Sequence, residues 1–123
     1  MKRILVVDDE PSNTLLVKLM LESVGIYEVF TENRGSLAVQ AARECHPHLI
    51  FLDMMMPDML GNEVAAALRE DLALRHIKVV FLTSMIKKGE EKISGKNMVI
   101  AKPISTKELV AVIEKELGEF DFV

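Results

Sequence analysis

Short apolar runs recur along the chain and are bounded by charged or polar residues. Four of them cover residues 4–7, 49–52, 79–82 and 98–101. Runs of this length that are rich in β-branched residues and apolar on both faces are typical of parallel strands buried beneath helices. A weaker run at 27–31 includes Glu28, so it suits a strand at the edge of a sheet. The pattern therefore predicts five strands.

The segments between these runs show helical periodicity. Residues 12–24 place four side chains on one face: Leu16, Leu19, Met20 and Ser23. Two further helices are predicted over 35–44 and 62–71. The last segment has an amphipathic stripe at Leu109, Val112, Ile113 and Leu117. Ser105 and Glu108 have the spacing of a capping box, which predicts where this last helix begins.

Strands that alternate with helices predict an α/β fold, with a parallel sheet and helices on both of its faces. Right-handed crossovers leave few topologies, and the favoured one is a doubly wound five-stranded sheet of order 2-1-3-4-5. The fourth helix should be short, because the segment at 84–97 has two glycines and little apolar periodicity. We expect one domain over 1–118 and a C-terminal tail at 119–123.

Composition narrows the class of protein. The formal net charge of −4 argues against direct nucleic-acid binding, since phosphate backbones need basic patches. The single cysteine, Cys45, excludes an internal disulfide and suits a reducing cytoplasm. No stretch approaches the roughly 18 apolar residues of a membrane span, so no membrane contact is expected. We therefore expect a soluble cytoplasmic protein.

Polar residues follow four of the five predicted strands at their carboxyl ends, where open α/β sheets bind ligands. They are Asp8, Asp9, Asp53, Thr83, Ser84 and Lys102. If the first and third strands are neighbours, three carboxylates converge, and their repulsion must be offset. Mg²⁺ can offset it and takes carboxylate, water and phosphate oxygens. A lysine and a hydroxyl suit the remaining oxygens of a bound phosphoryl group. Each residue alone is ordinary at a turn or cap, but together they favour a phosphoryl and metal site.

Four motifs at these strand ends carry a family resemblance: "ILVVDDEP", "LIFLDMMMPDMLG", "VVFLTS" and "IAKPIS". In this order they resemble the receiver domain of two-component response regulators over roughly 2–117. The resemblance implies the flavodoxin-like receiver fold of the chemotaxis regulator. It also implies a phosphorelay switch that catalyses only its own phosphorylation and dephosphorylation, rather than an enzyme with turnover.

The resemblance assigns the phosphoryl chemistry to three residues. Asp53 would accept a phosphoryl group from a histidine kinase or a histidine phosphotransfer protein and become 4-aspartylphosphate. Thr83 would bond a phosphoryl oxygen, and Lys102 would pair with Asp53 before transfer and with the phosphoryl group afterwards. The phosphorylated surface would then switch the binding of a downstream protein.

The resemblance also implies a Mg²⁺ site. Asp8, Asp9 and Asp53 would hold the ion together with the main-chain carbonyl of Met55. The bond between Lys102 and Pro103 is expected to be cis, a form whose cost is low only before proline.

Two features depart from the family pattern. The position three before Lys102 usually holds an aromatic ring, but here it is Val99, which puts the usual readout of activation in doubt. The segment between Thr83 and Lys102 is also shorter than usual, and the loss falls in a helix that commonly supports dimers. We therefore expect a monomer.

Two other functions remain open. One is a Mg²⁺-dependent phosphatase or phosphotransferase with an aspartyl nucleophile, although such enzymes usually place a second acid two residues later, where this chain has Met55. The other is a degenerate receiver that only binds partners, which the complete set of Asp8, Asp9, Asp53, Thr83 and Lys102 disfavours.

Overall fold

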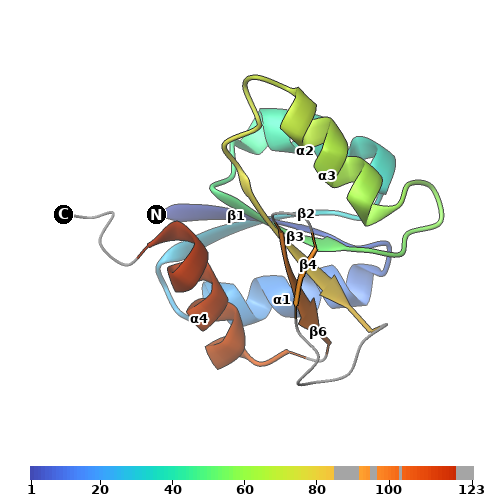
Figure 1. Ribbon diagram of the computed structural model, residues 1–123. Helices are drawn as coiled ribbons and strands as arrows, with labels where there is room; N and C mark the ends of the chain where they lie inside the picture. Colours follow the sequence, from blue (N-terminus) through green and yellow to red (C-terminus); the bar gives the residue numbers. More distant parts are fainter. Residues whose placement is uncertain (85–91, 95–96, 103, 119–123) are drawn as a thin grey trace.

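The computed structural model describes residues 1–84, 92–94, 97–102 and 104–118, and the elements follow the predicted alternation of strands and helices (Figure 1). In chain order they are β1 (Lys2–Val7), α1 (Pro11–Glu22), β2 (Tyr27–Glu32), the single 3₁₀ turn η1 (Gly35–Leu37), α2 (Ala38–Cys45), β3 (Leu49–Asp53), α3 (Gly61–Glu70), β4 (Lys78–Thr83), β5 (Lys92–Ser94), β6 (Asn97–Ala101) and α4 (Thr106–Leu117).

The sheet has the order β2-β1-β3-β4-β6-β5. The first five strands in this order pair in parallel. This confirms the predicted order 2-1-3-4-5, in which the fifth predicted strand corresponds to β6. The short strand β5 was not predicted; it pairs antiparallel with β6 at the sheet edge, where Lys92 lies opposite Val99. The expected short helix falls within 84–97, where residues 85–91 and 95–96 lie outside the described residues and 92–94 form this strand.

Helices cover both faces of the sheet, with α2 and α3 on one side and α1 and α4 on the other (Figure 1). Neighbouring residues of β1 face opposite layers, because side chains alternate along a strand. Leu5 and Val7 belong to the core beneath α2 and α3, whereas Ile4 and Val6 belong to the core beneath α1 and α4. A strand that is buried on both faces must be apolar at every position, which explains the uninterrupted runs in the sequence.

The packing face of α1 differs from the predicted one. The helix buries Thr14, Val17 and Leu21, whereas Leu16 and Leu19 are each 57% exposed. Apolar residues occupy most positions between 14 and 21, so periodicity alone did not identify one face. The way the helix docks on the sheet decides it, since Val17 and Leu21 lie in the same core cluster as strand residues.

The start of α4 agrees with the sequence. The Glu108 amide donates to the Ser105 hydroxyl at 3.1 Å, and the Ser105 amide donates to the Glu108 carboxylate at 3.1 Å. This capping box satisfies amides that the first helical turn leaves without partners. Among the described residues, no helix is both long enough and apolar enough to cross a membrane. The described chain ends at Gly118, and the predicted tail at 119–123 lies outside the described residues.

Candidate functional site

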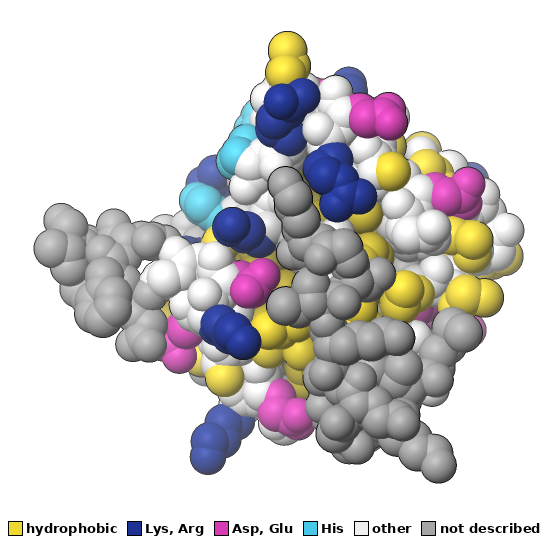
Figure 2. Space-filling view, in the orientation of Figure 1, with side chains coloured by type: hydrophobic (Ala, Val, Ile, Leu, Met, Phe, Trp, Pro, Cys, Tyr) yellow, Lys and Arg dark blue, Asp and Glu magenta, His cyan; other side chains and the backbone are white. Residues whose placement is uncertain are grey.

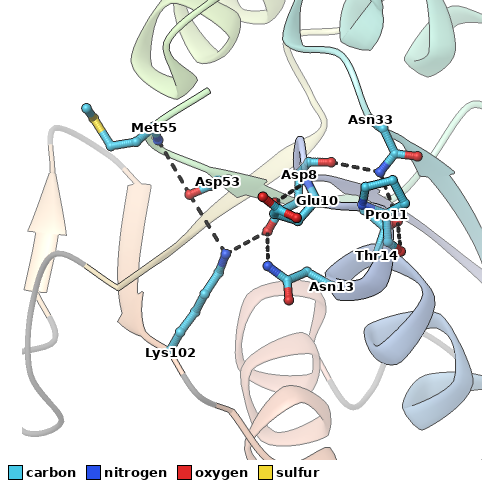
Figure 3. Close-up of polar contacts among 9 residues, drawn as sticks. All are labelled: Asp8, Glu10, Pro11, Asn13, Thr14, Asn33, Asp53, Met55 and Lys102. Atoms are coloured by element: carbon cyan, nitrogen blue, oxygen red, sulfur yellow. Dashed lines mark hydrogen bonds and ion pairs between the residues drawn. The ribbon is translucent and has the colours of Figure 1, made fainter. Parts of the chain in front are cut away.

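The parallel register brings the predicted site residues to one edge of the sheet. Val7 lies opposite Leu52 in the β1–β3 pair, so the residues that follow them, Asp8 and Asp53, are neighbours. Thr83 ends β4 and lies opposite Ala101 of β6, which places Lys102 next in line. Three strands that are distant in sequence therefore deliver their polar ends to the same place (Figure 3).

Three carboxylates form a compact cluster. Asp8, Asp9 and Asp53 each offer an oxygen, and these oxygens all lie within 4.8 Å of one another. The Lys102 ammonium donates to Asp8 Oδ2 at 2.6 Å and lies 3.9 Å from Asp53 Oδ1. One lysine does not balance three carboxylates, so the cluster retains negative charge. Its hard oxygen donors fit a divalent cation such as Mg²⁺.

Burial and charge act in opposite directions on Asp53. Burial raises the pKa of Asp53 above its usual value, and the carboxylate of Asp8 adds to this rise. The nearby ammonium of Lys102 lowers the pKa and is the largest opposing influence. Loss of that ammonium would therefore leave the Asp53 carboxyl harder to ionise.

Local backbone structure orients Asp8, which is only 4% exposed. The Glu10 amide donates to Asp8 Oδ1 at 3.0 Å, and the Asn13 carboxamide donates to Asp8 Oδ2 at 3.4 Å. Helix α1 begins at Pro11, a position where the missing amide hydrogen costs nothing. Residues 8–10, which we call the acidic turn, thus lead directly into the helix that supports them.

Two predicted site residues have only part of their geometry described. Thr83 is 1% exposed, and its backbone carbonyl accepts a hydrogen bond from the Lys102 amide at 2.8 Å. Met55 donates its amide to Asp53 Oδ1 at 3.4 Å, while its side chain is 54% exposed. The proposed roles of the Thr83 hydroxyl and the Met55 carbonyl remain predictions. The predicted cis bond before Pro103 involves a residue outside the described chain.

A cavity of about 340 Å³ opens beside the carboxylates. Its polar wall includes Asp8, Asp53 and Lys102, and its apolar wall includes Leu16 of α1 and Ile104. The cavity therefore connects the charged cluster with the exposed apolar side of α1.

Val99 occupies the position where the family usually has an aromatic ring. It is 1% exposed and lies in the core beneath α2 and α3. Its branched aliphatic side chain fills core space and has no ring to swing outward.

Sequence reasoning missed Asp58, which joins the loop after β3 to the start of η1. Its Oδ1 accepts from the Gly35 amide at 3.2 Å, and its Oδ2 accepts from the amide and hydroxyl of Ser36 at 3.0 and 2.7 Å. These hydrogen bonds lower the pKa of Asp58. A turn residue after Pro57 gives no sequence indication of partners more than 20 positions away.

Asp58→Asn is expected to destabilise the fold at neutral pH and to have less effect in acid. A folded-state pKa below the unfolded value of about 3.9 means that the stabilisation is present above that value. It is then lost as the pH falls through the folded-state pKa. Urea unfolding of both proteins between pH 7 and pH 2.5 measures the difference.

The matched control for this experiment is Glu22→Gln, an exposed carboxylate at the end of α1. Its unfolding midpoint should stay close to wild type across the same range. A constant difference between wild type and Asp58→Asn at every pH would contradict the proposed ionic origin of the contact.

Charged side chains are mixed on the face that Figure 2 shows. Among the residues coloured by type, Lys and Arg side chains are interspersed with Asp and Glu on this face. This agrees with the net charge of −4, and the expected lack of direct nucleic-acid binding remains a prediction.

Comparisons with known proteins agree with the geometry. The sequence model of the response regulator receiver domain family matches residues 4–114 of this chain. The polar-differentiation response regulator DivK of Brucella ovis is 36% identical over 121 residues, which covers 96% of this chain and 98% of the relative. Its counterpart in Brucella anthropi is 35% identical over the same coverage.

Solved structures show the same fold. Chemotaxis protein CheY4 of Vibrio cholerae has a TM-score of 0.81 and 25% identity, covering 94% of this chain and 98% of that one. The N-terminal domain of a response regulator receiver protein from Methanoculleus marisnigri has a TM-score of 0.71 and 30% identity, covering 97% and 98%. With a family match over most of its length and relatives that align from end to end, this chain belongs to the response regulator receiver domain family.

Proposed function

We propose that this chain is a phosphoacceptor switch in which Asp53 takes a phosphoryl group from a histidine kinase or a histidine phosphotransfer protein in a Mg²⁺-dependent reaction. Receiver domains are signalling domains and generally bind Mg²⁺ through acidic residues. The observation that carries the proposal is the cluster of Asp8, Asp9 and Asp53 within 4.8 Å, with Lys102 3.9 Å from Asp53.

The chemistry follows from the charges. A carboxylate oxygen of Asp53 forms a bond to phosphorus as the bond from phosphorus to the donor imidazole nitrogen breaks. The departing imidazole keeps the bonding electron pair and takes up a proton. Charge develops on the equatorial oxygens of the phosphoryl group, and the Lys102 ammonium is close enough to neutralise part of it. Bound Mg²⁺ would supply the remaining charge neutralisation.

The exposed side of α1 supports a protein as the phosphodonor. Leu15, Leu16 and Leu19 are between 55% and 57% exposed, which is unusual for three leucines on one short helix. Leu16 also lines the cavity that contains Asp53. A donor helix whose apolar side chains cover these leucines would bring its phosphohistidine to the carboxylate.

We further propose that the aspartyl phosphate alters the surface that a downstream protein recognises, since it differs from a carboxylate in charge and shape. On this proposal the chain acts in the cytoplasm as a monomeric switch and its chemistry is confined to its own Asp53.

Incubation with acetyl phosphate and Mg²⁺, followed by intact-mass measurement, tests the proposal. Wild type should gain the mass of one phosphoryl group, and Asp53→Asn should gain none. Glu22→Gln serves as the control, because it removes an exposed carboxylate outside the cluster and should still be phosphorylated.

Two other results would overturn the proposal in different ways. Continuous consumption of acetyl phosphate without a lasting mass gain would favour the aspartyl phosphatase or phosphotransferase. If wild type showed neither consumption nor mass gain, the chain would be a receiver that only binds partners.

A further inference from the structure

Asn33 links the acidic turn to the helix that follows it. This residue lies just after β2, and its carboxamide nitrogen donates to the backbone carbonyl of Asp8 at 2.8 Å (Figure 3). The same nitrogen donates to the Thr14 hydroxyl of α1 at 3.0 Å. Both hydrogens of one amide group are therefore used, one on each side of the turn.

The contact with Asp8 acts on two carboxylates at once. The carbonyl that accepts the hydrogen bond belongs to the planar peptide unit that joins Asp8 to Asp9. Fixing the orientation of this unit limits the directions in which both side chains leave the backbone. The Asp8 amide also donates to the Glu32 carbonyl at 3.2 Å, so residues 32–33 hold the backbone of Asp8 from both sides.

The contact with Thr14 reaches the same carboxylates through α1. Thr14 is 2% exposed, and its hydroxyl donates to the Pro11 carbonyl at 3.1 Å while it accepts from Asn33. These bonds fix the first turn of the helix. That turn also carries Asn13, whose carboxamide donates to Asp8 Oδ2.

We propose that Asn33 is a positioning residue that holds Asp8 and Asp9 in the geometry that binds Mg²⁺, without itself contacting the ion. Three carboxylates within 4.8 Å repel one another, and a free peptide unit would relax to separate them. The donors of Asn33 oppose this relaxation before the ion arrives. The inference rests on the proposed function, because it assumes that this cluster is the metal site.

The chemistry of the side chain explains why an amide suits this position. Both of its partners present oxygen lone pairs to the Asn33 nitrogen. A carboxylate here would oppose the Asp8 carbonyl and add a fourth negative charge to the cluster. A neutral group with two donors satisfies both acceptors and adds no charge.

The test is a Mg²⁺ titration followed by amide chemical shifts, without any phosphodonor. We expect Asn33→Ala to weaken Mg²⁺ affinity about tenfold, a usual effect of removing a group that orients a metal ligand. The control is Asn62→Ala, which removes an exposed asparagine from α3 and should bind Mg²⁺ as wild type does.

Thr14→Val provides a second variant with less risk to the fold. Valine matches threonine in shape, so it keeps the buried packing and removes the hydroxyl, which accepts from Asn33 and donates to the Pro11 carbonyl. We expect a smaller loss of Mg²⁺ affinity than for Asn33→Ala, because the contact with Asp8 remains. This variant also tests the inference if Asn33→Ala does not fold.

Thermal unfolding without metal separates a positioning role from a purely structural one. If Asn33 only stabilised the fold, its removal would lower the melting temperature and leave the Mg²⁺ affinity of the folded protein unchanged. Wild-type affinity in Asn33→Ala, or in Thr14→Val if the first variant is unfolded, would overturn the inference. If wild type accepts a phosphoryl group in that case, the proposed function stands and only the role of Asn33 is wrong. If wild type binds no Mg²⁺, both proposals fail.

Discussion

Lys102→Met is expected to lower the rate of Asp53 phosphorylation by about 100-fold or more, the usual effect of removing a group that stabilises charge in a transition state. The Lys102 ammonium lies 3.9 Å from Asp53 Oδ1 and donates to Asp8 Oδ2. Methionine has a similar length but carries neither the positive charge nor the hydrogen-bond donors of the ammonium. The initial rate of mass gain with acetyl phosphate and Mg²⁺ measures the effect.

The same substitution should also change the ionisation of Asp53. Because Lys102 is the main influence that lowers the pKa of Asp53, its loss should raise that pKa further. A pH titration of the Asp53 carboxyl carbon by NMR follows the shift. Lys78→Met is the matched control, since this exposed lysine begins β4 at the opposite end of the sheet. Phosphorylation of Lys102→Met at the wild-type rate would exclude the proposed role of the ammonium.

Gly61→Ala is expected to destabilise the protein by about 3 kcal/mol, at the upper end of the usual cost of overpacking. A β-carbon at this position would lie 2.3 Å from the Asp53 carbonyl oxygen and 2.8 Å from Met54 Cα. Both are backbone atoms, so no side-chain rotation relieves the clash. The Gly61 amide also donates to the Met54 carbonyl at 2.9 Å, which holds the two segments together. Urea unfolding gives the loss.

Gly25→Ala is the control that separates this clash from the general effect of losing a glycine. Gly25 has a φ of +88°, but nothing lies within 4 Å of an added β-carbon. Its substitution should cost about 1 kcal/mol, the ordinary penalty of the left-handed region. Equal stability of the two variants would show that the backbone of Asp53 and Met54 moves aside and relieves the clash. The Gly61 variant should also accept a phosphoryl group more slowly, because the displaced backbone belongs to Asp53.

Local sequence was enough to predict the strands of the parallel sheet and their polar ends. A parallel strand that is buried on both faces must be apolar throughout, and its first polar residue marks where it leaves the core. This is why Asp53 could be identified as the end of a central strand. Once the strand order was predicted, Asp8 and Lys102 followed as the neighbours of Asp53.

Periodicity was not enough for the packing of α1. Apolar residues occupy most of its positions, so several faces satisfy the pattern equally well. The sheet beneath the helix decides which side is buried, and it leaves Leu15, Leu16 and Leu19 at the surface. Similarly, β5 exists as a strand through its pairing with β6, a contact that a three-residue segment does not encode by itself.

The chain's own pattern indicated the parallel strands and the polar residues at their carboxyl ends, because burial and strand periodicity are local properties. The strand order then followed from the handedness of the crossovers. Only the tertiary structure decided how those residues are held. Asn33 reaches Asp8 across 25 positions, and Asp58 reaches Ser36 across 22. Each contact depends on one polar side chain that meets its partner only after the sheet has assembled, so no repeat or spacing along the chain marks it.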